Sequence, residues 1–78
     1  MVNVTNHKIG SFDIENEPYK YVQMTQVRTQ TELGVAFKYE VRVSDNDSIN
    51  DHKNLSKSEA LQLFHDSIST LMLARMLR

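Results

Sequence analysis

The chain has 78 residues, no cysteine and nearly balanced charge, with nine Lys and Arg against ten Asp and Glu. Its length predicts one domain over residues 1–78, and a domain of this size buries only about 60% of the surface of its unfolded chain. The lack of cysteine excludes a disulfide framework and a thiolate metal site. The formal charge of −1 excludes a strong field that would attract nucleic acid or an acidic membrane.

The first residues do not resemble a targeting signal. Residues 1–7 are polar apart from isolated valines, and they lack a basic region followed by an apolar one. No apolar run approaches the roughly 18 residues of a membrane-spanning helix. We therefore expect a cytoplasmic protein without a membrane segment, whose first residues form a short edge strand or a loose end.

The first predicted strand covers residues 8–14 and contains one irregularity. Phe12 and Ile14 alternate, as the residues of one strand face do, whereas Ile9 lies one position out of phase. Glycine tolerates a positive φ at a β-bulge, so a bulge at Gly10 would return Ile9 to the face of Phe12. We therefore expect a bulged strand.

After a turn at residues 15–18, the pattern predicts two strands, over residues 19–30 and 35–44, joined as a hairpin. The second strand alternates strictly, which indicates a central strand with one buried face. Its apolar face consists of Val35, Phe37, Tyr39, Val41 and Val43.

The length of the connection sets the register of this hairpin. With residues 32–33 at the tip, Met24 lies opposite Val41 and Val22 lies opposite Val43. A three-residue tip would instead bury the other face of the first strand, leaving polar groups inside at a cost of about 1 to 3 kcal/mol each. We favour the two-residue tip. In this register the hairpin becomes polar toward its tip, so we expect its outer half to project beyond the helix.

Residues 44–54 contain almost no side chain that a core would accept, apart from Ile49, and we expect a loop. Its three aspartates suggest a calcium loop. The EF-hand pattern, however, requires Gly at the sixth position and Glu at the twelfth, where this chain has Asn50 and Ser56. We therefore interpret the segment as a solvated connection.

The last third of the chain predicts one long amphipathic helix. Ser56 and Glu59 have the spacing of a capping box, in which each side chain binds the backbone amide of the other residue. No glycine or proline interrupts residues 57–77. The apolar stripe that we expect to face the sheet consists of Leu61, Phe64, Ile68, Leu71 and Met72.

Toward the C-terminus the apolar residues spread beyond this stripe. An apolar side chain left in water forfeits roughly 1.5 to 3 kcal/mol relative to burial, and a small core also favours oligomerisation. A frayed terminus, or a sheet that wraps further round the helix, is the alternative. We expect the last two turns to contact a second copy of the chain through Leu71, Leu73, Met76 and Leu77.

The residue pattern offers little support for catalysis or metal binding. His7, His52 and His65 lack the spacing that brings imidazoles together on zinc. No serine lies in a nucleophile elbow, and the two glycines form no phosphate-binding loop. His65 borders the apolar stripe, as a buried neutral imidazole or as a pH-sensitive interface contact. We expect no catalytic residue, cofactor or metal.

The sheet face away from the helix is predicted to be polar, as the solvated face of an antiparallel sheet usually is. Tyrosine and arginine among threonine and glutamine also suit an adaptable protein contact. Nucleic acid is the alternative, because the cations can meet phosphates and Tyr21 can stack on a base, although Glu40 lies among them. The predicted partner-binding residues are Tyr21, Arg28, Lys38 and Arg42.

These patterns predict an α+β fold, in which a three-stranded antiparallel meander is covered on one face by a single long C-terminal helix. The expected function is non-catalytic: an adaptor, regulator or inhibitor that binds a larger protein and acts as a homodimer. Such compact chains are common among accessory proteins of phages and mobile elements. A nucleic-acid-binding regulator that uses the polar sheet face is the alternative.

Overall fold

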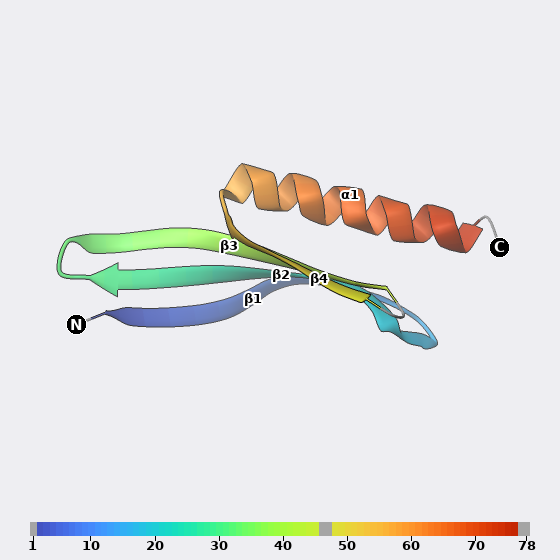
Figure 1. The fold of residues 1–78 in the computed structure, drawn as a ribbon, viewed down its shortest axis with the longest axis horizontal. Helices are drawn as coiled ribbons and strands as arrows, with labels where there is room; N and C mark the ends of the chain where they lie inside the picture. Colours follow the sequence, from blue (N-terminus) through green and yellow to red (C-terminus); the bar gives the residue numbers. More distant parts are fainter. Residues whose placement is uncertain (1, 46–47, 77–78) are drawn as a thin grey trace.

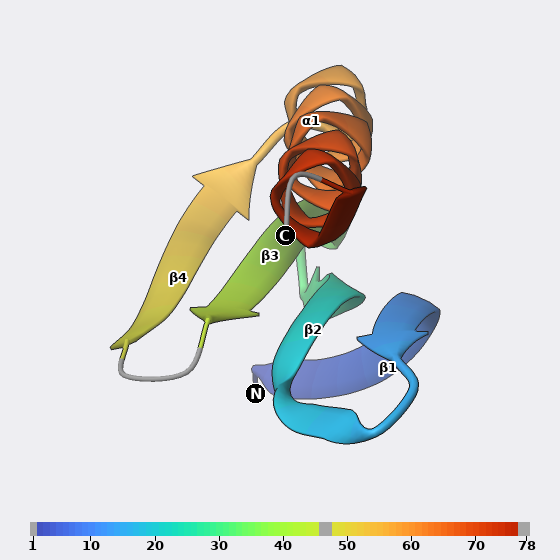
Figure 2. The same cartoon turned by 90° about the vertical axis from the view of Figure 1, so that its right-hand side faces the viewer.

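The computed structural model describes residues 2–45 and 48–76, which form four antiparallel strands followed by one helix (Figure 1). The elements are β1 (Asn3–Ile14), β2 (Glu17–Thr31), β3 (Gly34–Asp45), β4 (Ser48–Leu55) and α1 (Lys57–Met76). The strands lie in the sheet in chain order, and α1 covers one face of it, above β2 and β3 and beside β4 (Figure 2). The predicted α+β class and the single C-terminal helix are confirmed, but the sheet has four strands rather than three.

The additional strand is β4, where the sequence predicted a loop over residues 44–54. Nearly every residue of Ser48–Leu55 is exposed, so the strand forms without burying an apolar face. Pairing with β3 gives its backbone groups hydrogen-bond partners instead. The ladder is irregular between Tyr39 and Val41, and Asn54 adopts a φ of 59° just before the chain turns into α1.

The predicted register of the β2–β3 hairpin is confirmed. Met24 pairs with Val41, and Val22 pairs with Val43. The tip is the two-residue connection, closed by Gly34 with a φ of 135°, a backbone angle that glycine adopts without strain. Val22 and Val41 are consequently 0% exposed.

The predicted bulge in β1 is also present, although its effect differs from the expectation. Lys8 pairs with Thr25 and Gly10 pairs with Met24, so Ile9 is the extra residue. Gly10 takes the position that faces α1, whereas Ile9 stays 45% exposed. The predicted bulge is thus confirmed, but it does not bring Ile9 into the core, and the placement of Ile9 on the face of Phe12 stays a prediction.

Gly10 is required for a close approach rather than for an unusual backbone angle. A Cβ atom at this position would lie 3.2 Å from Cζ of Phe64 in α1. This is closer than ordinary van der Waals contact, so a larger residue would push the ring of Phe64 away. Gly10 thus allows the Phe64 ring of α1 to pack closely against β1.

The start of α1 has the predicted capping box. Ser56 Oγ accepts a hydrogen bond from the Glu59 amide at 3.2 Å, and Glu59 Oε1 accepts one from the Ser56 amide at 3.2 Å. The first backbone bond of the helix follows, from the Ala60 amide to the Ser56 carbonyl at 2.9 Å. These bonds satisfy amides that a helix start otherwise leaves without partners. No helix of the described residues is long and apolar enough to cross a membrane.

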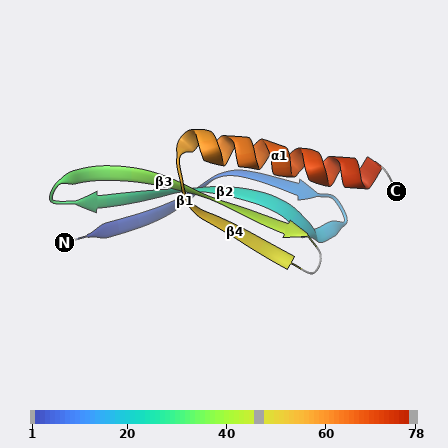
Figure 3. The ribbon, with the colours of Figure 1, turned by 45° about the horizontal axis from the view of Figure 1, so that its top comes forward.

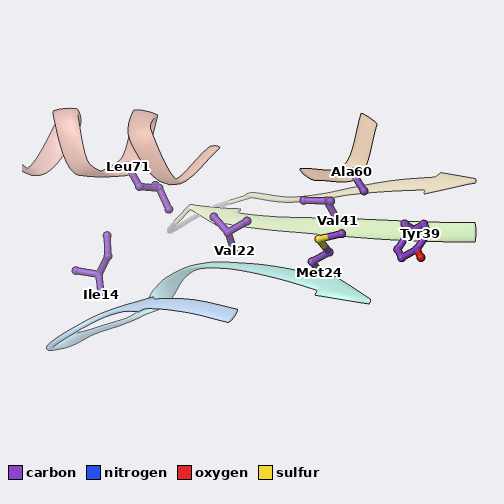
Figure 4. Close-up of a cluster of buried hydrophobic side chains, with 7 residues drawn as sticks. All are labelled: Ile14, Val22, Met24, Tyr39, Val41, Ala60 and Leu71. Atoms are coloured by element: carbon purple, nitrogen blue, oxygen red, sulfur yellow. The ribbon is translucent and has the colours of Figure 1, made fainter. Parts of the chain in front are cut away.

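The core lies between α1 and one half of the sheet (Figure 4). Its buried apolar side chains are Ile14, Val22, Met24, Tyr39, Val41, Ala60 and Leu71. The predicted helix stripe is confirmed in part. Its Phe64, Ile68 and Leu71 pack in or against this core. Leu61 and Met72 are 39% and 48% exposed, and the buried position of the first turn is instead Ala60, which is 0% exposed. The small side chain of Ala60 lets the first turn approach the strands, and this turns Leu61 outward.

The molecule is elongated because α1 covers only part of the sheet's length. Its extents are 52 × 21 × 17 Å, and its radius of gyration is 14.5 Å, compared with about 11.5 Å for a compact domain of this length. The β2–β3 tip and the first part of β1 continue beyond the start of α1 (Figure 3). We call this projecting part, residues 2–6 and 27–38, the wing.

Candidate functional site

One face of β3 carries an apolar row that α1 covers only in part. Under the helix, Tyr39 is 8% exposed and Val41 is 0% exposed. In the wing, Val35 and Phe37 on the same strand face are 46% and 48% exposed. The apolar row of β3 is therefore exposed in the wing and buried under α1, and the change occurs where α1 starts.

Polar side chains of β2 lie beside the open part of this row. Arg28 pairs with Phe37, and Gln30 pairs with Val35. The Arg28 guanidinium donates a hydrogen bond to Gln30 Oε1 at 3.2 Å. The helix-side surface of the wing thus combines an apolar row with a half-buried cation.

The opposite sheet face, which we call the polar face, carries Tyr21, Lys38 and Arg42. The register places all three on one side of the sheet, but Lys38 lies in the wing, about 13 Å along the strand from Arg42. Arg28 belongs to the other face, because neighbouring strand residues point to opposite sides. Grouping Arg28 with these three residues is therefore corrected.

Arg42 is held by an acidic residue of β4. Its Nε donates to Asp51 Oδ1 at 2.7 Å, and its Nη2 donates to Asp51 Oδ2 at 3.2 Å. These hydrogen bonds and the opposite charge raise the pKa of Arg42 and lower the pKa of Asp51, and Tyr21 adds a further hydrogen bond to Arg42. The sequence analysis missed this ion pair because it interpreted the segment containing Asp51 as a loop.

Two hollows lie on different sides of the molecule. On the polar face, a hollow of about 240 Å³ is lined by Asn6, Gln23, Thr25, Glu40, Arg42 and Asp51. A second hollow, of about 360 Å³, lies between α1 and β4; Leu63 and Leu71 form its apolar floor, and Asp45 and Asp66 lie at its rim. The first offers mixed charges and hydrogen-bonding groups, which suit a polar protein contact.

The predicted self-association residues separate into two groups. Leu71 is 6% exposed because it belongs to the core of its own chain, and its assignment to an interface is corrected. Leu73 and Met76 are 57% and 76% exposed on α1. Leu77 lies outside the described residues.

His65 is exposed, and its ring meets the ring of Phe64 edge-on, with the centroids 6.1 Å apart. The interpretation of His65 as a buried imidazole is therefore wrong, while an interface role remains a prediction. Within residues 2–45 and 48–76, no group of His, Asp and Glu is arranged to hold a metal ion.

No protein-family model, no curated protein and no solved structure matches this chain.

Proposed function

We propose that this chain is a cytoplasmic, non-catalytic binding protein: an adaptor, regulator or inhibitor that contacts a larger protein and acts as a homodimer. The observation that carries the homodimer of this proposal is the partly covered row on β3. Val35 and Phe37 keep the apolar alternation of the core, yet each remains nearly half exposed. Contiguous apolar surface of this kind marks protein contacts in soluble proteins.

The arrangement of the cations favours protein over nucleic acid. Arg42 is bound to Asp51, and Lys20, only 7% exposed, forms a salt bridge with Glu17 at 3.3 Å. Arg28 points to the opposite side of the sheet from Lys38. Binding of phosphates is strongest where several cations line one surface, whereas a mixed surface suits the rim of a protein interface.

Two carboxylates of the described residues, Asp51 and Glu59, have shifted pKa values with structural explanations. The pKa of Glu59 is lowered by hydrogen bonds from Ser56 in the capping box. The pKa of Asp51 is lowered by its bond to Arg42. Catalytic groups are usually shifted by burial and charge within a cleft. These shifts instead accompany hydrogen bonds that fix the start of α1 and the pairing of β4 with β3.

The polar face is the surface that we assign to the larger partner. Arg42 donates two hydrogen bonds to Asp51, which restrict its side chain before any partner arrives. Ordering in advance lowers the entropic cost of association. Lys38 is exposed at the wing end of the same face and extends the contact along β3.

Affinity capture from extracts of cells that contain the protein tests the proposal. We expect a stoichiometric protein that survives nuclease treatment and is lost with Lys38→Glu. Lys57→Glu is the matched control, because it makes the same charge change at an exposed residue of α1 and should retain the partner. A nuclease-sensitive spread of ribosomal or chromosomal proteins would instead establish the nucleic-acid alternative.

A further inference from the structure

The chain exposes more surface than a compact protein of its mass. Its accessible surface is 5783 Å² for 9.0 kDa, whereas the scaling for folded monomers gives about 4,850 Å². The surplus of roughly 900 Å² is close to the ~800 Å² that each partner contributes to a standard protein–protein interface. The surplus therefore matches one partner's share of a stable dimer.

Two exposed apolar patches lie on the same side of the sheet. The first is in the wing, where Val35 and Phe37 stand on the helix side of β3, with Leu33 fully exposed (100%) at the tip. The second is on α1, where Leu73 and Met76 point away from the buried side of the helix. In profile, α1 fills the layer above one half of the sheet and leaves the layer above the wing open (Figure 1).

We propose that a second copy of the chain fills this layer, so that the helix of each copy lies over the wing of the other. This inference rests on the homodimer of the proposed function and specifies its geometry. A two-fold axis near the start of α1 generates the arrangement. The interface uses the same two surfaces on both copies, so it closes as a dimer and leaves no open end for further addition.

The lengths of the two surfaces agree. Close to the axis, Ala60 and Tyr39 belong to the same buried cluster. Leu73 lies 13 residues along the helix from Ala60, about 20 Å away at 1.5 Å per residue. Val35 lies about 13 Å from Tyr39 along the strand, and Leu33 lies further out, in the turn at the tip. The last turns of one helix therefore lie over the tip of the second copy's wing.

The polar parts of the two surfaces also correspond. Arg28 lies two positions outward from the level of Tyr39, about 7 Å from it along the strand. Asp66 is exposed on α1, about 9 Å from Ala60 along the helix, and accepts a hydrogen bond from Gln62 at 3.0 Å. The arrangement brings Arg28 of one copy to the level of Asp66 of the other, which pairs opposite charges inside the same interface.

The dimer leaves both polar faces on the outside. Each polar face lies on the sheet side away from α1, whereas the proposed contact uses the helix side. Tyr21, Lys38 and Arg42 of both copies therefore stay open for a larger partner. A dimer of this kind presents the same surface twice, which raises avidity for a partner with two matching sites.

Sedimentation equilibrium in the micromolar range tests the interface. We expect a dimer for the unmodified chain, and a dissociation constant raised by roughly 30-fold or more in Leu73→Glu and in Val35→Glu, the change that hot-spot residues produce. Ile49→Glu is the matched control, because Ile49 is 58% exposed but pairs on the polar face. Its dimer should be unchanged.

Cross-linking then tests the specific geometry. Because the sequence contains no cysteine, an introduced cysteine can form a disulfide only with the cysteine of another chain. Mixing Leu33→Cys with Leu73→Cys under mild oxidation should give a disulfide-linked heterodimer, while Ile49→Cys with Leu73→Cys should not. A monomeric wild type would overturn both this interface and the homodimer of the proposed function. A dimer that resists both Glu variants and gives no Leu33–Leu73 cross-link would overturn this interface alone, leaving capture through the polar face to stand.

Discussion

The covered half of the sheet and the wing are built from the same strands but are stabilised in different ways. Under α1, Val22 and Val41 are fully buried, and the side chains add hydrophobic stabilisation to the backbone ladder. In the wing, the ladder between β2 and β3 continues in register to Gly34 although Val35 and Phe37 remain open. Backbone pairing therefore extends the sheet into the wing, whereas the side chains of the sheet are buried only where α1 covers them.

The largest expected difference in the free energy of unfolding comes from making the same Val→Ala substitution in the covered half of the sheet and in the wing. Val41→Ala removes buried methyl groups and leaves a cavity, so we expect it to lower the free energy of unfolding by about 2 kcal/mol. Val35→Ala, on the same strand face, should cost less than about 0.5 kcal/mol in the monomer. Urea denaturation at a protein concentration below the dimer range measures both. Equal losses would show that the wing is packed like the core.

The two glycines extend this comparison, because Gly10 lies under α1 and Gly34 lies in the wing. Gly10→Ala places a Cβ against Phe64, and we expect a loss of about 1 to 2 kcal/mol. Gly34→Ala has open space but a φ of 135°, so its cost, also about 1 to 2 kcal/mol, arises from backbone strain. Phe64→Leu should therefore reduce the cost of Gly10→Ala in a double-mutant cycle and leave that of Gly34→Ala unchanged. Additivity in both cycles would contradict the contact explanation.

The smallest expected effect is a loss of stability in acid. The pKa of Asp51 is lowered by its bond to Arg42, and that of Glu59 by its bonds to Ser56. Because both values are lower in the folded chain, their stabilisation is present above the ordinary values of 3.8 and 4.5 and is lost as pH falls through the folded values. Denaturation across an acid pH series should show a shallower decline in Asp51→Asn and in Glu59→Gln. An unchanged slope would assign the decline to other carboxylates.

The sequence predicted the elements that carry a strong local pattern. Strict alternation identified the strand from Val35 onward, and the two-residue tip then set the pairing of Met24 with Val41. The spacing of Ser56 and Glu59 identified the helix start. Each of these features depends on neighbours in the chain, so one sequence is enough to show it.

The remaining features depend on contacts between distant segments. Strand β4 was missed because it is held by backbone pairing rather than by apolar alternation, and the partner of Arg42 was missed with it. The inward position of the first turn of α1 was misjudged because Leu61, Leu63 and Phe64 place apolar groups around much of the first turns. Only contact with the sheet selects Ala60 as the inward position.

Both outer strands of the sheet are interrupted near their middle or their end. β1 contains the bulge at Ile9, and β4 loses its regular pairing opposite Tyr39 and Val41. Charged side chains, including Asp51 and Lys53, also line the exposed strand β4. Bulges and charges on edge strands hinder the addition of a further strand from another molecule. Both edges of the long, open sheet are therefore poor templates for strand addition, which would leave its faces for the contacts that we propose.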